Sequence, residues 1–160
     1  MSVLIKLIED EDRNKISELV REFWADEIIV VHGKVFQTRS LPGFLAIKDD
    51  EIIGSIHYQI RGEEGEIITL ASIKQGMGIG SALVAEVEKV ARKSHCKVLS
   101  VTTTNDNLRA LGFYQRRGFH LAALFPGQVD QSRRLKPTIP KIGDGNIPIR
   151  DELRLKKLLD

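Results

Sequence analysis

Apolar and polar positions in the first part of the chain predict a strand followed by an amphipathic helix. Val3–Ile8 is a β-branched and aliphatic run, which favours a strand. Four acids follow it, and apolar side chains then recur at helical spacing from Ile16 to Phe23. Acids at the start of such a segment suit the positive end of a helix dipole, so the segment is predicted to be helical.

The middle of the chain predicts antiparallel strands. Residues 28–31 and 35–37 are compatible with short strand fragments around a glycine. Phe44–Lys48 and Ile52–Arg61 flank three consecutive acids and predict a β-hairpin. Glu66–Ser72 is aliphatic enough to be a central strand of a sheet.

The second half of the chain alternates helices and strands before the pattern is lost. It predicts a helix from Gly78 to about Ser94, a strand Val98–Thr103, a helix Asn107–Arg117 and a strand Phe119–Phe125. Residues 126–150 contain four prolines and predict mostly irregular structure. Residues 151–158 are ambiguous by periodicity alone.

The order β-α-β-β-β-α-β-α-β places antiparallel hairpin strands before one parallel β-α-β crossover. It predicts an α/β (α+β) fold, in which a mixed, mostly antiparallel sheet has a central parallel β-α-β unit and helices on both faces. A length of 160 residues predicts a single domain over residues 1–160.

Composition argues against several partners and cofactors. A formal net charge of +2 and an aromatic content of 6% give no support for nucleic acid or a membrane as partner. The lone Cys96 excludes an intramolecular disulfide, and the four histidines lack metal-ligand spacing, so we expect no metal. No stretch approaches the ~20 apolar residues that span a bilayer, and the N-terminus lacks signal-peptide features, which favours a cytoplasmic location.

A glycine-rich loop joins the strand that ends at Ser72 to the next helix. Gly76, Gly78 and Gly80 alternate with larger residues, and a missing Cβ lets the backbone approach a ligand closely. The first N–H groups of the helix lack intrahelical partners and, with the helix dipole, form a phosphate site. No acid occurs from Gly78 to Ala85, which leaves this helix end available to an external anion. A tight turn without a ligand is the alternative.

The residues after the loop argue against two common classes of phosphate-binding loop. A Walker loop needs Gly-Lys-Ser/Thr, whereas Gly80 is followed by Ser81-Ala82, so phosphoryl transfer is disfavoured. A dinucleotide fingerprint needs glycine or alanine where Ser81 stands. Because Asp106 follows the next strand and could mimic a ribose-binding acid, a dinucleotide-binding oxidoreductase remains an alternative.

The loop resembles the Gln/Arg-x-x-Gly-x-Gly/Ala signature of the GNAT superfamily of N-acetyltransferases. Residues 107–119 resemble the family's Asn-x-x-Ala…Tyr…Gly-Phe segment, and residues 151–158 resemble its last strand. The resemblance covers nearly the whole chain, most specifically residues 66–119. It implies an acyl-CoA-dependent enzyme that transfers the acetyl group of acetyl-CoA, its co-substrate, to a primary amine by direct attack. A non-catalytic acyl-CoA-binding sensor on the same fold is a second alternative.

The resemblance also implies roles for individual residues. Tyr114 matches the family's tyrosine near the coenzyme sulfur and is expected to be the general acid. Glu66 is expected to be the general base, and the alternative base is a water or a residue of 25–42. The expected coenzyme contacts are Leu70, Ala71, Ser72, Gln75, Gly76, Gly78, Gly80, Ser81 and Asn107. Residues 25–42 and 126–150 would form the acceptor pocket, but their mixture of charges does not identify the amine. The expected partners are therefore acetyl-CoA and an amine-bearing acceptor, and a homodimer is left open.

Overall fold

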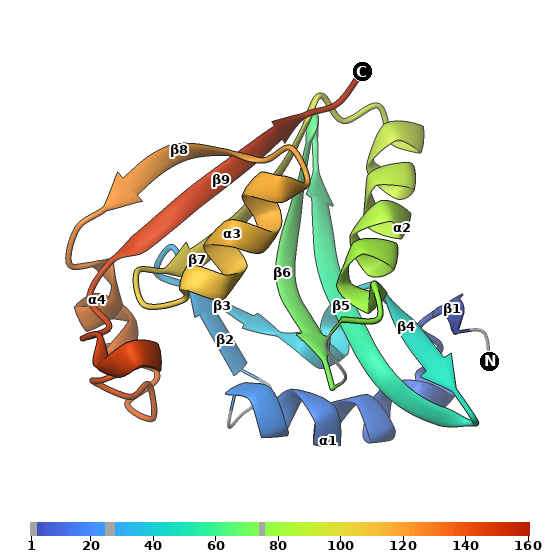
Figure 1. The fold of residues 1–160 in the computed structure, drawn as a ribbon, viewed down its shortest axis with the longest axis horizontal. Coiled ribbons are helices and arrows are strands. Elements are labelled where there is room, and N and C mark those ends of the chain that lie inside the picture. Colours follow the sequence, from blue (N-terminus) through green and yellow to red (C-terminus); the bar gives the residue numbers. More distant parts are fainter. Residues whose placement is uncertain (1–2, 25–27, 74–75) are drawn as a thin grey trace.

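A seven-stranded sheet runs through the centre of the protein in the computed structural model, which describes residues 3–24, 28–73 and 76–160 (Figure 1). The strands follow the spatial order β1-β4-β5-β6-β7-β9-β8. Their bounds are β1 Leu4–Leu7, β4 Gly43–Lys48, β5 Glu51–Arg61, β6 Glu64–Ser72, β7 Val98–Thr104, β8 His120–Phe125 and β9 Glu152–Leu158. A separate hairpin is formed by β2, Ile28–Val31, and β3, Lys34–Gln37.

Helices cover both faces of the sheet because successive strand residues point to opposite sides. The α-helices are α1 Arg13–Trp24, α2 Ile79–Lys93, α3 Leu108–Arg116 and α4 Gln128–Leu135. Leu45 of β4 packs with Ile16 and Val20 of α1. Its neighbours Phe44 and Ala46 belong to the main core, which β4 shares with α2 and α3. The predicted mixed, mostly antiparallel sheet with helices on both faces is therefore confirmed.

The parallel pair β6 and β7 divides partway along its length. Pairing runs from Glu64 opposite Val98 to Ile67 opposite Val101. Beyond this point β6 continues to Ser72 against β5 alone, and β7 continues to Thr104 against β9. The two strands diverge in Figure 1. A bulge at the same place, where Ile68 has no partner in the register with β5, adds local twist. The divergence leaves part of the β6 backbone without a strand partner on its β7 side.

Three segments differ in detail from the sequence pattern. Residues 28–31 and 34–37 do form strands, joined by a turn at His32 and Gly33, both with positive φ. Residues 126–150, predicted to be mostly irregular, contain helix α4. The ambiguous C-terminal segment becomes β9, which pairs with both β7 and β8. Across the described residues, every helix is too short or too polar to cross a membrane.

Candidate active site

The glycine-rich loop is open to ligand on its exposed side. Gly76 and Gly78 have φ values of 80° and 72°, a region that side chains with a Cβ rarely adopt. A Cβ built on either residue would have no described atom within 4 Å. These two glycines are therefore required by the backbone conformation and not by packing. Gln75, the first residue of the signature, lies outside the described residues.

The start of helix α2 has the features of an anion site. Gly78 is the N-cap, no side chain caps the helix, and the first turn contains no acid. Ser81, in this first turn, accepts a hydrogen bond at Oγ from Arg117 Nε. Arg117 also lies over the ring of Phe113, 3.8 Å from its centroid. The helix end thus combines unpaired backbone donors with a neighbouring guanidinium.

Gly80 differs from the two glycines that precede it. Its added Cβ would lie 3.0 Å from Phe113 Cζ. The third glycine therefore permits α2 and α3 to pack closely. A hollow of about 440 Å³ lies beside the same helix end and is lined by Ser81, Val84, Ala85, Glu88, Arg116, Arg117 and Lys157.

Helix α3 carries two of the predicted residues. Asn107 is its N-cap, and Asn107 Oδ1 accepts a hydrogen bond from the Ala110 N–H at 3.1 Å. Tyr114 is buried in the main core, and its ring makes edge contacts with Phe113 and Phe119 at centroid distances of 5.1 and 5.3 Å. Burial raises the pKa of the Tyr114 phenol well above its ordinary value, so the phenol keeps its proton at neutral pH.

Leu70, Ala71 and Ser72 lie on the part of β6 that has separated from β7. They pair on one side with Ile56, Ser55 and Gly54 of β5. Backbone groups of a strand alternate between its two edges, so this segment directs some donors and acceptors toward the β7 side. The position suits an extended ligand that hydrogen-bonds to backbone.

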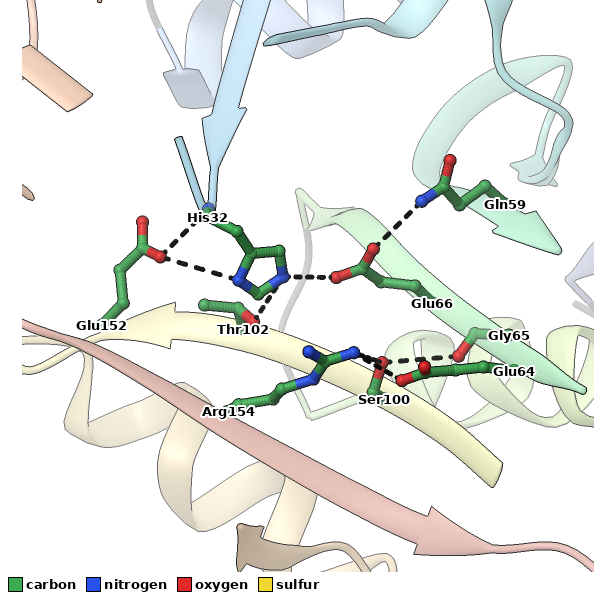
Figure 2. Close-up of polar contacts among 9 residues, drawn as sticks. All are labelled: His32, Gln59, Glu64, Gly65, Glu66, Ser100, Thr102, Glu152 and Arg154. Carbon is green, nitrogen blue, oxygen red and sulfur yellow. Dashed lines mark hydrogen bonds and ion pairs between the residues drawn. The ribbon is translucent and has the colours of Figure 1, made fainter. Parts of the chain in front are cut away.

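Glu66, the predicted base, is part of a buried polar group that we call the His32 cluster (Figure 2). Its other members are His32, Gln59, Thr102 and Glu152. His32 Nε2 lies 2.7 Å from Glu66 Oε2 and 3.1 Å from Thr102 Oγ1. Gln59 Nε2 donates to the other oxygen of Glu66 at 3.1 Å. Both carboxylate oxygens of Glu66 are therefore engaged by side chains.

The ionisation of Glu66 fixes which nitrogen of His32 carries hydrogen. Burial alone would raise the pKa of Glu66, but the hydrogen bonds from His32 and Gln59 and the His32 charge outweigh it, so the pKa is lowered. An ionised carboxylate only accepts hydrogen bonds, so Nε2 of His32 must be the donor to it. The second ring nitrogen, Nδ1, then faces Glu152.

Glu152, at the start of β9, approaches His32 from the opposite side. The His32 backbone N–H donates to Glu152 Oε1 at 3.1 Å, and Nδ1 lies 3.9 Å from the same oxygen. Glu152 is only 3% exposed. Burial raises its pKa and so does the nearby Glu66, against the lowering effect of the His32 N–H and charge. Two buried carboxylates therefore face one imidazole.

A cavity of about 390 Å³ adjoins this cluster. Thr102 and Glu152 belong both to its wall and to the His32 cluster. The full lining is Glu22, Ile29, Val30, Val31, Ile68, Thr102, Thr103, Thr104, Asn107, Val129, Ser132, Lys136, Thr138, Ile139, Pro140, Ile149 and Glu152. These residues come largely from the two segments expected to form an acceptor pocket. Asn107, which lines the cavity, is also the N-cap of α3.

The family motif singles out Glu66 as a candidate base, but no sequence pattern indicates which residues surround it. His32 is one of four histidines without metal-ligand spacing, and Glu152 lies in the segment of ambiguous periodicity. Asp106, considered as a ribose-binding acid, instead accepts hydrogen bonds from the Thr104 hydroxyl and, at 3.3 Å, from the Asp144 N–H. Among the residues that the structure describes, no three metal-ligating side chains are grouped in a way that could hold an ion.

Comparison with known proteins gives a consistent result. The model of the Acetyltransferase (GNAT) family matches residues 5–119. Over 149 residues the chain is 40% identical to the uncharacterized protein YdhI of Bacillus subtilis, with 92% of this chain and 93% of YdhI covered. The fold is similar to that of an IAA acetyltransferase from Bacillus cereus, with a TM-score of 0.74, 23% identity, and 99% and 100% of the two chains covered. A GNAT acetyltransferase from Elizabethkingia anophelis, solved with acetyl-CoA bound, has a TM-score of 0.68 at 21% identity, with 98% of each chain covered.

Proposed function

Because the chain belongs to the Acetyltransferase (GNAT) family, we propose that it transfers the acetyl group of acetyl-CoA to a primary amine by direct attack. The observation that supports this most directly is the contact between His32 and Glu66, beside a cavity whose wall includes Asn107. It provides a proton acceptor next to a space that an amine can enter. The open glycine loop follows β6, the strand that carries Glu66, after Ser72.

The loop and its surroundings fit a pyrophosphate. Gly76 and Gly78 leave the exposed side of the loop free, and the α2 N-terminus offers backbone donors to an anion. Ser81 would contact the same anion, and Leu70–Ser72 would hydrogen-bond to an extended arm. When bound, acetyl-CoA supplies the acetyl group as a reactive thioester.

Glu66 and His32 together are proposed as the base. An alkylamine with a pKa of about 10.4 is protonated at neutral pH and must lose a proton before it can attack. Since both oxygens of Glu66 are already engaged, the proton first passes to the free nitrogen of His32. Glu66 then stabilises the imidazolium that forms and keeps the ring oriented.

Tyr114 is proposed as the acid. Its raised pKa means that the phenol carries a proton throughout the neutral range. It could donate that proton to the leaving thiolate. Its place on α3, in the same core as the start of α2, is compatible with this role.

The experiment separates binding from turnover. Calorimetric titration with acetyl-CoA and NADH is followed by thiol-release assays on a panel of primary amines. We expect acetyl-CoA to bind in preference to NADH and at least one amine to be acetylated. Glu66→Gln should lower kcat about a hundredfold and leave acetyl-CoA affinity within about twofold.

Glu64→Gln is the matched control, because Glu64 lies two residues away on the same strand and pairs with Arg154 instead of His32. Its kcat should stay within about threefold of wild type. Acetyl-CoA binding without turnover on any amine would indicate the sensor, and preferred binding of NADH would indicate the oxidoreductase.

A further inference from the structure

We propose that the cavity binds its acceptor as an alkylammonium cation through Glu152 Oε2, so that the substrate is a small primary amine with one positive charge and an apolar body. The inference rests on the proposed function and names the substrate class of the same site. It is carried by the charge balance of the His32 cluster, the orientation of Glu152 and the lining of the cavity.

The His32 cluster contains more negative than positive groups. Glu66 and Glu152 are 7% and 3% exposed, and a single imidazole lies between them. Arg154, the nearest guanidinium, donates to the Glu64 carboxylate and, at 3.4 Å, to Ser100 Oγ (Figure 2). Lys136, the cation in the cavity wall, donates to the Ile28 carbonyl at 2.7 Å, and neither Lys136 nor Arg154 is hydrogen-bonded to Glu152. A buried carboxylate without a cation in direct contact is costly, so an ammonium ligand at Glu152 would supply that contact.

The two oxygens of Glu152 have different surroundings. Oε1 accepts the His32 N–H at 3.1 Å. No described residue donates to Oε2, which points away from the ring in Figure 2, and the Glu152 side chain is part of the cavity wall. Glu152 is 3% exposed as a residue, and an oxygen of it that has no donor among the described residues and lies beside a cavity favours a ligand that donates a charged hydrogen bond.

The rest of the wall indicates the body of the ligand. Aliphatic side chains from four elements line it, namely Ile29 and Val31 of β2, Ile68 of β6, Val129 of α4 and Ile149 before β9. A volume of about 390 Å³ is at the small end of ligand sites. A carboxylate placed at the Glu152 end of the cavity would meet two like charges, which disfavours it at that position.

The position of His32 gives the bound ammonium a route for its proton. His32 Nδ1 lies 3.9 Å from Glu152 Oε1, so an ammonium that binds Oε2 and bridges to Oε1 would approach this nitrogen. One N–H bond of the ammonium breaks and an N–H bond forms at Nδ1, while the electron pair stays on the amine nitrogen. The neutral amine and an imidazolium between two carboxylates result.

The test compares three probes of equal length on the full chain in the presence of CoA: hexylamine, 1-hexanol and hexanoate. Affinities are measured by NMR titration, which detects weak binding. We expect wild type to bind hexylamine at least about tenfold more tightly than 1-hexanol and to bind hexanoate least. Glu152→Gln should lose about tenfold or more of its hexylamine affinity and keep its 1-hexanol affinity within about twofold.

Glu18→Gln is the matched control, because Glu18 is an exposed carboxylate of α1 that does not line the cavity. Its hexylamine affinity should stay within about twofold. Glu152→Asp, which keeps the charge but shortens the arm, should lie between wild type and Glu152→Gln. If a variant fails to fold, the comparison of the three probes on the wild-type protein still tests whether the cavity prefers an ammonium.

Equal binding of hexylamine and 1-hexanol, or unchanged hexylamine affinity in Glu152→Gln, would overturn the inference. These failures are separable from failure of the proposed function. Absence of acetyl-CoA binding removes the proposed function, whereas acetyl-CoA binding and amine acetylation without any dependence on Glu152 remove only this assignment.

Discussion

The coenzyme side and the acceptor side of the proposed site are built by different means. The coenzyme side is nearly continuous in sequence, from Leu70 to Ser81, and it uses backbone conformation and the N-terminus of α2. The acceptor side combines side chains from α1, β2, β6, β7, α4 and β9. The hydrogen bond between His32 and Glu152 alone spans 120 positions.

This difference determines how each side can be changed. A backbone site depends on φ values and on space, so glycines are its sensitive positions. A side-chain site depends on charge and on the tertiary contacts that hold each group, so isosteric changes at carboxylates and hydroxyls are its sensitive tests. Damage to one side should therefore leave binding at the other side intact.

The largest expected effect is the loss of coenzyme binding in Gly78→Glu. The substitution places a side chain at φ 72° and a negative charge at the α2 N-terminus, where an anion is expected. We expect acetyl-CoA affinity to fall at least about a hundredfold, because a like charge at short range costs several kcal/mol. Calorimetry measures this loss, and hexylamine binding should be retained.

Gly62→Glu provides the matched control for that change. Gly62 has φ 58° in the turn between β5 and β6, and an added Cβ there also meets nothing within 4 Å. The two variants thus carry comparable backbone strain and the same charge. If both lose acetyl-CoA affinity equally, the effect comes from strain, and the loop does not hold the coenzyme.

The strand, loop and helix of the proposed coenzyme side could be predicted from the sequence because their determinants are local. The strand, the glycine loop and the amphipathic helix follow one another, and the observed α2 starts one residue after Gly78. The hairpin of β4 and β5 could be predicted for the same reason, since a run of acids separates two apolar segments. In the structure, Asp49 and Asp50 form its turn, both with positive φ.

The acceptor side could not be predicted in the same way, because tertiary contacts create it. Helix α4 buries only Val129 and Ser132, so its apolar periodicity is weak. Arg133 holds it in place by donating at 2.7 Å to the carbonyls of Pro140 and Ile149. His32 joins Glu66 only because the β2–β3 turn lies against the sheet, which no local pattern encodes.

A second, smaller effect is expected from Tyr114→Phe, which tests the chemical step between the two sides. The ring and its contacts with Phe113 and Phe119 are retained, but the phenolic proton is lost. We expect kcat to fall about tenfold to a hundredfold and acetyl-CoA affinity to stay within about twofold. Steady-state kinetics with the best amine from the panel, together with calorimetry, measures both.

Tyr58→Phe is the matched control for the loss of a phenol. Tyr58 is the other tyrosine of the chain, is buried in the same core, and stacks on Phe44 at 6.1 Å between centroids. Its kcat should remain within about twofold of wild type. Equal rates for wild type and Tyr114→Phe would remove Tyr114 from the mechanism while leaving both binding sides unaffected.

The smallest expected effect on activity concerns the sheet that supports both sides, where the change is in stability. His57 of β5 is fully buried, its Nδ1 lies 2.7 Å from Thr69 Oγ1, and burial followed by the charge of Arg13 lowers its pKa from 6.5 to about 4. The unfolded chain therefore takes up this proton near pH 6.5, while the folded protein resists it until about pH 4. The stability present above pH 6.5 falls as the pH drops through this window, by about 3 kcal/mol for this group.

Denaturant unfolding between pH 7.5 and 4.5 measures this loss. In His57→Gln, the free energy of unfolding should depend less on pH, by the contribution of one proton. His120→Gln, which removes an exposed histidine on β8, should follow the wild-type profile. An unchanged slope in His57→Gln would show that other groups cause the acid sensitivity. Because His57 is not among the residues proposed for either side of the site, the kcat of His57→Gln at pH 7.5 should stay within about twofold of wild type.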